Sequence, residues 1–175
     1  MDNIEIVSDE SGRKIVLLSR IIFLNRQNIE WDKVEKYLGK YIDEVVEIAE
    51  TKDIIYIGKK FPDEYCGSKY TRKMKGTRAK AKANAAQGIK EMLNIATDKK
   101  FRQNHKDKHS DNAQNGWYYY ITRFALPVYE NEKNTGKYNV YSACLVVNFA
   151  SNNKLYLYDL VDIKKEASNP LKTIT

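Results

Sequence analysis

The chain has 175 residues with 42% apolar and 30% charged side chains and a formal net charge of +7, the composition of an ordinary globular domain. Its longest apolar stretch, IVLLSRIIFL, contains Ser19 and Arg20 and falls far short of the roughly 20 residues of a membrane-spanning helix, so we expect no membrane partner. Two distant cysteines do not suggest a disulfide framework and the acidic start lacks a signal-peptide pattern, so we expect one cytoplasmic domain over residues 1–175.

The first half of the chain predicts a hairpin, a helix and a short strand. Residues 4–7 and 14–24 are rich in Ile, Val, Leu and Phe and are separated by a Ser-Gly turn, which is typical of a hairpin. Apolar residues between 31 and 46 recur with helical spacing, so we expect a helix over residues 28–50. In the connecting segment 51–76, residues 53–57 predict a strand and residues 61–76 an irregular basic loop.

The second half predicts one more helix and then a sheet. The basic, alanine-rich segment 77–97 is expected to be helical, and its Gly88, which costs about 1 kcal/mol against Ala inside a helix, indicates close packing. Its predicted core stripe consists of Ala85, Ala86, Ile89, Met92, Leu93 and Ala96. A loop over 98–115, antiparallel strands in 116–166 and a polar tail over 167–175 follow. The expected class is α+β, with the N-terminal hairpin and two main helices packed on a C-terminal antiparallel β-meander.

The positive charge is concentrated in one segment. Residues 69–90, KYTRKMKGTRAKAKANAAQGIK, contain eight Lys and Arg and no Asp or Glu, so this segment contributes +8 and the rest of the chain about −1. A localised positive charge favours a polyanion or an acidic protein surface as the partner.

Two of these cations, Arg78 and Lys82, continue the apolar stripe of the predicted helix, whereas Lys80 and Asn84 point the other way. One interpretation is that the stems of Arg78 and Lys82 pack against the core while their charged ends reach water. The other is that both side chains border a cleft between helix and sheet, where they hold a phosphate and stabilise its charge.

Arg123 and the histidines are further candidates. Arg123 shares a strand face with Trp117 and Tyr119, so it forms either an exposed cross-strand ion pair or a contact with a base and a phosphate. His105 and His109 are weak as a metal site; either is adequate as a general acid or base, and an ordinary loop position is the alternative. We expect no metal and no cofactor.

Several long segments resemble a domain found in large polyvalent proteins of phages and conjugative elements of Gram-positive anaerobes. These segments are KKFPDEYCGSKYT, AKAKANAAQGI, GWYYYITRFALPV, YNVYSACLVV and LYLYDLVDIKKEASNPL, together with IEWDKVEKYL near the N-terminus. The resemblance covers nearly the whole chain. It implies the fold of the barnase, EndoU, colicin and RelE nucleases, with helices before an antiparallel sheet, and metal-independent RNA cleavage in which the 2′-hydroxyl attacks the adjacent phosphate.

The resemblance and the residue patterns together define the candidate site. The resemblance points to Lys80, Lys82, Asn84, His109, Trp117, Arg123, Asp159, Lys164 and Lys165. We expect three catalytic residues: Lys82 to neutralise the phosphate, His109 to move the proton and Arg123 to position the nucleotide. The expected substrate-binding residues are Arg78, Lys80, Asn84, Trp117 and Tyr119. The family usually has Tyr-Arg-Tyr-Asp where this chain has Tyr-Tyr-Tyr-Ile at 118–121.

These observations leave more than one function open. The chain is either a metal-independent ribonuclease or toxin-like domain of a mobile element, with RNA favoured over DNA and a cognate immunity or inhibitor protein as a further partner, or a non-catalytic module that binds nucleic acid or an acidic protein through the same basic face. A basic structural protein without a ligand is a third interpretation. A phosphate-binding site serves both of the first two functions, so the sequence alone does not separate them.

Overall fold

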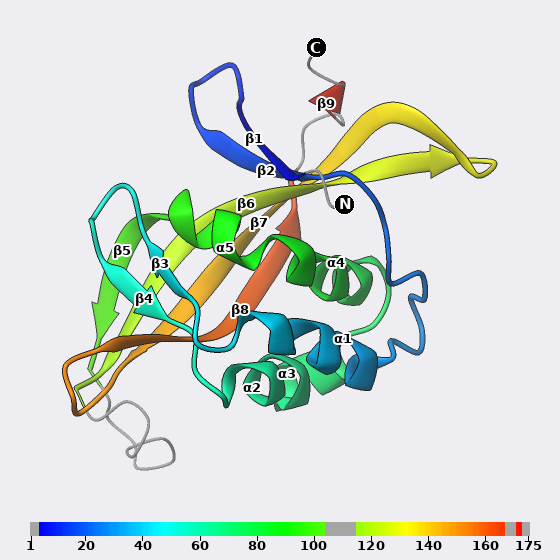
Figure 1. The fold of residues 1–175 in the computed structure, drawn as a ribbon. Coiled ribbons are helices and arrows are strands. Elements are labelled where there is room, and N and C mark those ends of the chain that lie inside the picture. Colours follow the sequence, from blue (N-terminus) through cyan, green and yellow to red (C-terminus); the bar gives the residue numbers. More distant parts are fainter. Residues whose placement is uncertain (1–3, 104–114, 167–170, 173–175) are drawn as a thin grey trace.

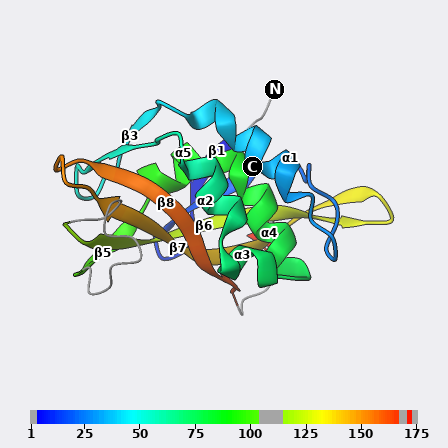
Figure 2. The ribbon, with the colours of Figure 1, turned by 90° about the horizontal axis from the view of Figure 1, so that it is seen from below.

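The computed structural model describes residues 4–103, 115–166 and 171–172, and it confirms the predicted α+β class. A curled sheet runs through the molecule, and the helices gather on one side of it (Figures 1 and 2). The strands are β1 (Ile4–Ser8), β2 (Lys14–Leu18), β3 (Val45–Glu47), β4 (Ile54–Tyr56), β5 (Thr97–Arg102), β6 (Trp117–Glu130), β7 (Lys133–Phe149), β8 (Leu155–Lys165) and β9 (Leu171–Lys172).

The sheet is built around three long neighbouring strands. Its order is β1-β2-β6-β7-β8-β4-β3, with β5 also paired to β6 and β9 to β7. The pairs β6–β7 and β7–β8 are antiparallel, whereas β2 joins β6 and β4 joins β8 in parallel. The parallel joins bring N-terminal segments to both flanks of the C-terminal strands.

The helices are short and follow one another closely along the chain. They are α1 (Trp31–Leu38), α2 (Phe61–Gly67), α3 (Lys69–Lys73), α4 (Thr77–Ala85) and α5 (Ile89–Asn94), with 3₁₀ turns at Gly39–Tyr41 and Ala86–Gly88. Elements α2 and α4 pack on β8, and α5 packs on β2 and β6. One face of the central strands is therefore covered by helices.

The core lies between these helices and the sheet. Side chains on one face of β6 and β7 point into this core and are buried. They are Tyr120, Phe124, Leu126, Tyr141, Ala143, Leu145 and Val147. All six members of the predicted stripe between residues 85 and 96 are fully buried, which confirms that prediction. A Cβ atom on Gly88 would lie 2.9 Å from Leu18 Cδ2 and 3.2 Å from Val16 Cγ1, so close packing at this glycine is confirmed as well.

The predicted first helix is too long. In the structure, α1 ends at Leu38. After one 3₁₀ turn the chain reverses at Asp43, whose φ is 73°. Beyond Asp43, Val45–Glu47 forms β3 against β4. The apolar spacing of this stretch fits a helix, but pairing with a later strand determines its structure.

Three other predicted segments also differ from the structure. The second helix is divided at Gly88, where φ is −123°. Residues 61–76, expected to be irregular, contain α2 and α3; Pro62 lies in the first turn of α2, where a missing N–H costs little. Strand β5, which pairs with β6, takes the last residue of the predicted helix 77–97 and residues 98–102 of the predicted loop.

Candidate functional site

Lys82 is fully buried, with 0% of its surface exposed. Its Nζ lies 2.7 Å from Asp159 Oδ1 on β8 and donates to Thr71 Oγ1 at 2.6 Å. The ring centroids of Tyr65 and Tyr70 lie 4.6 and 5.3 Å from the same nitrogen. Protein groups surround the amine, so both interpretations of Lys82, an amine in water and an amine bordering an open cleft, are wrong.

Lys82 and Asp159 form a buried ion pair that joins α4 to β8. Burial lowers the pKa of Lys82 and raises the pKa of Asp159, because a medium of low polarizability disfavours either charge, and each partner partly offsets the effect on the other. The backbone N–H of Leu160 also donates to Asp159 Oδ1, at 2.7 Å. The arrangement satisfies both charges internally and leaves no room for a phosphate between them.

Arg123 is also held by carboxylates. It is 7% exposed; Nε and Nη2 donate to the two Glu166 oxygens at 2.7 and 2.8 Å, and Nη1 donates to Asp9 Oδ2 at 2.9 Å. The hydrogen bonds that Arg123 donates to the Glu166 carboxylate raise the pKa of Arg123. Arg123 therefore forms ion pairs, one of the two predicted alternatives, but Arg123 itself is buried while the side chains of Glu166 and Asp9 are partly exposed.

The sheet separates Lys82 from Arg123. Tyr120, Thr122 and Phe124 of β6 are buried on the helix side, where Thr122 Oγ1 donates to the Met92 carbonyl at 2.9 Å. Because neighbouring strand residues face opposite ways, Arg123 lies on the other face. The predicted convergence of these two residues on one cleft is wrong, and His105 and His109 lie outside the described residues.

Three of the predicted substrate-binding residues lie on α4. Asn84 is fully buried: its Oδ1 accepts from the N–H groups of Ile22 and Phe23 at 2.8 and 3.0 Å, so the prediction that it points away from the core is wrong. Arg78 is exposed, so it does not continue the buried stripe as predicted. Lys80 is half-buried, and burial lowers its pKa, as does the positive charge of Arg26 to a smaller extent.

The two aromatic candidates lie on β6 and are half-buried. Trp117 packs edge-on against Tyr158, with ring centroids 5.0 Å apart. The guanidinium carbon of Arg102 lies over the ring of Tyr119, 5.0 Å from the ring centroid. Burial raises the pKa of Tyr119. Tyr119 also lines a groove of about 330 Å³ on the helix-free face, together with Arg102 and Lys164. Tyr119 therefore stays accessible beside cations, as a substrate-binding role requires.

A run of exposed cations follows the chain from α3 into α4. This cationic surface consists of Lys69, Arg72, Lys73, Lys75 and Arg78. Within the part of the chain that the structure describes, none of the five forms an ion pair. Two other cations of the same segment are engaged, Lys82 with Asp159 and Lys90 with Glu44 at 3.3 Å. The charge predicted for this segment is thus mostly presented to solvent.

A cavity of about 390 Å³ lies between α2 and the start of β8. Its lining includes Lys59, Lys60, Glu64, Asn148 and Tyr156. Glu64 is half-buried, and burial raises its pKa to about 7. A carboxyl group that titrates near neutrality can donate or accept a proton under physiological conditions.

Sequence reasoning missed Glu64 and Asn148. Asn148 carries a usable signal, since it is the polar residue in the apolar run CLVVNFA at the end of β7. Glu64 carries none, because an acidic residue in FPDEY is unremarkable until tertiary packing buries it.

Among the described residues, no cluster of three or more His, Cys, Asp and Glu side chains could hold a metal ion. In the same part of the chain, no helix combines the length and apolar character needed to cross a membrane. Comparison with protein-family models, curated proteins and solved structures finds no significant match in any of the three. The resemblance to domains of polyvalent phage proteins therefore stays a prediction.

Proposed function

We propose that the chain binds RNA through the cationic surface of α3 and the first turn of α4. The observation that carries this proposal is the exposure of Lys69, Arg72, Lys73, Lys75 and Arg78 with no ion pair to any described carboxylate. Cations held this close to one another repel, and a polyanion relieves the repulsion.

The composition of the surface suits phosphate. Lysine offers a compact charge on a flexible stem, whereas the arginine guanidinium can donate two parallel hydrogen bonds to one phosphate group. Neutralising several phosphates releases their counterions, which supplies the sequence-independent part of nucleic-acid affinity.

The test compares two variants with equal loss of charge. In the surface variant Lys73→Gln, Lys75→Gln and Arg78→Gln are combined; in the control variant Lys14→Gln, Lys133→Gln and Lys137→Gln remove three exposed cations of β2 and β7. Binding to labelled single-stranded RNA is measured by fluorescence anisotropy. The affinity of the surface variant should be at least about tenfold lower than that of the control variant, because several phosphate contacts are lost. Equal affinities of the two variants would contradict the proposed surface, and RNA-independent capture of an acidic protein would redirect the function to a protein partner.

Metal-independent cleavage of the bound RNA is implied by the family resemblance and is tested in the same samples. The positions of Lys82 and Arg123, both buried in ion pairs on opposite sides of the sheet, do not support it. The protein is incubated with transfer RNA and total RNA across a range of pH, with and without divalent ions. If the RNA stays intact, the protein binds RNA without cleaving it. Fragments ending in cyclic phosphate would establish the nuclease.

A further inference from the structure

Four polar side chains line one cavity at the start of α4. The cavity has a volume of about 170 Å³, and these side chains are Arg26, Lys80, Asn139 and Tyr141. Within the part of the chain that the structure describes, none of the four side chains forms an ion pair or a hydrogen bond. Polar groups of folded proteins are usually paired, so unpaired donors gathered around one hollow indicate a ligand.

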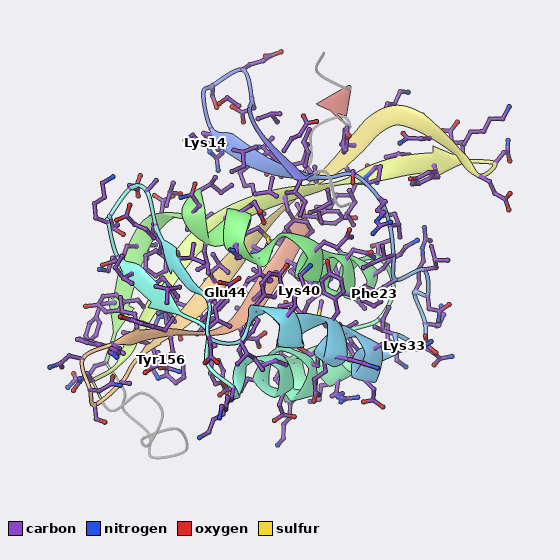
Figure 3. All side chains as sticks on the ribbon, in the orientation of Figure 1. Lys14, Phe23, Lys33, Lys40, Glu44 and Tyr156 are labelled. Carbon is purple, nitrogen blue, oxygen red and sulfur yellow. The ribbon has the colours of Figure 1, made fainter. Side chains whose placement is uncertain are left out.

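Hydrogen bonds of the backbone bring the two cations to the same end of α4. The Asn84 side chain accepts from the N–H of Phe23 at 3.0 Å and donates to its carbonyl at 2.9 Å, so the segment around Phe23 runs beside α4 (Figure 3). Further along this segment, the Arg26 carbonyl accepts from the N–H of Gly76 at 3.0 Å. The N–H of Lys80 donates to the Gly76 carbonyl at 3.1 Å. Gly76 therefore joins the backbones of both cationic residues.

Tyr141 of β7 supplies a hydroxyl group that opens onto the cavity. Its ring stacks on that of Phe124 with centroids 5.3 Å apart, and the residue is only 4% exposed. Within the described residues the hydroxyl makes no hydrogen bond, yet the fully enclosed atom without a partner is Asn148 Oδ1 and not this oxygen. A ligand in the cavity can therefore reach it. Burial raises the pKa of Tyr141, so the hydroxyl keeps its proton at neutral pH and can donate.

The positive charges at the cavity are not balanced by the protein. Burial lowers the pKa of Lys80, and the nearby charge of Arg26 lowers it further. Among the described residues that line the cavity there is no Asp or Glu. Thr77 begins α4 at the same cavity, and no side chain caps this end of the helix, so its backbone N–H groups favour an anion as well.

The size of the cavity limits what it can hold. A volume of about 170 Å³ lies below the roughly 300–1,000 Å³ of sites for drug-sized molecules, so a phosphate group fits and a whole nucleotide does not. A phosphate monoester at the end of a chain carries a charge of about −1.5 to −2 at neutral pH and can balance two cations. A phosphodiester inside the chain carries a single negative charge and balances one of them.

We propose that this cavity binds the terminal phosphate of an RNA chain. Arg26 and Lys80 hold the phosphate oxygens through charge-assisted hydrogen bonds, and the Tyr141 hydroxyl donates one more. The site rests on the proposed RNA binding. Lys75 and Arg78 of the cationic surface lie close to Thr77 in the chain, so the rest of the RNA can continue from the cavity onto that surface.

RNAs that differ only at their ends test the cavity. Three single-stranded RNAs of one sequence, labelled inside the chain, carry a 5′-phosphate, a 3′-phosphate or hydroxyls at both ends, and fluorescence anisotropy measures their affinities. At least one phosphorylated RNA should bind about tenfold more tightly than the hydroxyl-ended RNA, because charge-assisted hydrogen bonds are gained. Equal affinities of all three would overturn the site. They would do so even if inorganic phosphate shifted the NMR signals of Lys80 and Tyr141, since the cavity would then take the free ion.

The cavity variant combines Arg26→Gln and Lys80→Gln, and its matched control combines Lys14→Gln and Lys133→Gln. The cavity variant should bind phosphorylated and hydroxyl-ended RNA about equally, whereas the control and the surface variant should keep the roughly tenfold ratio. If the surface variant binds RNA weakly while no protein prefers a phosphorylated end, the cavity assignment fails and the proposed RNA binding stands. A preference for phosphorylated ends without any effect of the surface variant is the reverse outcome.

Tyr141→Phe separates a ligand-binding role of the hydroxyl from a structural one. Because this hydroxyl has no partner among the described residues, its removal should leave the melting temperature unchanged. The advantage of the phosphorylated RNA should fall about threefold, the effect of one lost hydrogen bond. A lower melting temperature with an unchanged affinity ratio would show that the hydroxyl serves the fold and would contradict the site.

Discussion

The half-buried carboxyl group of Glu64 makes the stability of the folded protein depend on pH. Its pKa of about 7 in the folded protein lies above the ordinary value of 4.5, mainly because burial disfavours the charged form. The folded protein consequently holds this proton more tightly than the unfolded chain does. The stability that the protonated form provides is complete below pH 4.5 and is lost as pH rises through about 7.

Glu64→Gln should remove this loss, because glutamine does not ionise. We expect the melting temperature of the variant relative to the wild type to increase steadily as pH rises from about 4.5 to about 7 and then to level off. Thermal unfolding followed by circular dichroism at several pH values measures the difference. A difference that stays constant with pH would show that Glu64 keeps an ordinary pKa in the folded state.

Individual partners of charged residues were beyond the reach of the sequence. The sequence left an exposed cross-strand ion pair and a contact with a nucleotide as alternatives for Arg123, because its partners Asp9 and Glu166 are 114 and 43 residues away along the chain. Asn84 is similar, because its partners are backbone groups of a segment 61 and 62 residues earlier. Such contacts depend on tertiary packing, which no local pattern encodes.

Between elements, the Lys82–Asp159 pair joins α4 to β8 across the core. With 0% and 4% of the two side chains exposed, water cannot solvate either charge if the other is removed. The attraction within such a pair roughly balances the cost of burying it, so the pair adds little net stability, whereas one partner alone is strongly destabilising.

Lys82→Met should therefore lower the free energy of unfolding by about 3–5 kcal/mol, since Asp159 is left buried without a counter-charge. The double variant Lys82→Met with Asp159→Leu should recover most of this loss, because it leaves no buried charge. Chemical denaturation of the wild type and both variants measures these differences. A double variant as unstable as the single one would mean that packing of the lysine stem, and not its charge, supports the fold.

Apolar spacing predicted the buried positions of elements better than their boundaries. All six residues of the stripe between 85 and 96 are buried as predicted, but residues off the stripe such as Asn84 and Gln87 are buried as well. The same spacing misassigned residues 45–47, which pair with β4 after the reversal at Asp43. Pro62 and Gly67 suggested an irregular segment, yet Pro62 lies in the first turn of α2 and Gly67 is its last residue.

For the whole molecule, charge distribution is the property that the sequence predicted most usefully. The excess of positive charge in residues 69–90 becomes an exposed surface over α3 and α4. The α+β class was predicted as well. Lys82 and Arg123 do not meet in the expected catalytic cleft, because the sequence placed one on a helix and the other on a strand without showing on which side of the sheet each side chain lies.

The salt dependence of RNA affinity tests the central claim most directly. For single-stranded RNA, the logarithm of the binding constant should fall linearly with the logarithm of salt concentration, with a slope of about −0.7 for each phosphate neutralised. The variant with Lys73→Gln, Lys75→Gln and Arg78→Gln should show a slope shallower by about 2, whereas the variant with Lys14→Gln, Lys133→Gln and Lys137→Gln should keep the wild-type slope. Identical slopes for all three proteins, or no RNA binding even at low salt, would contradict the account.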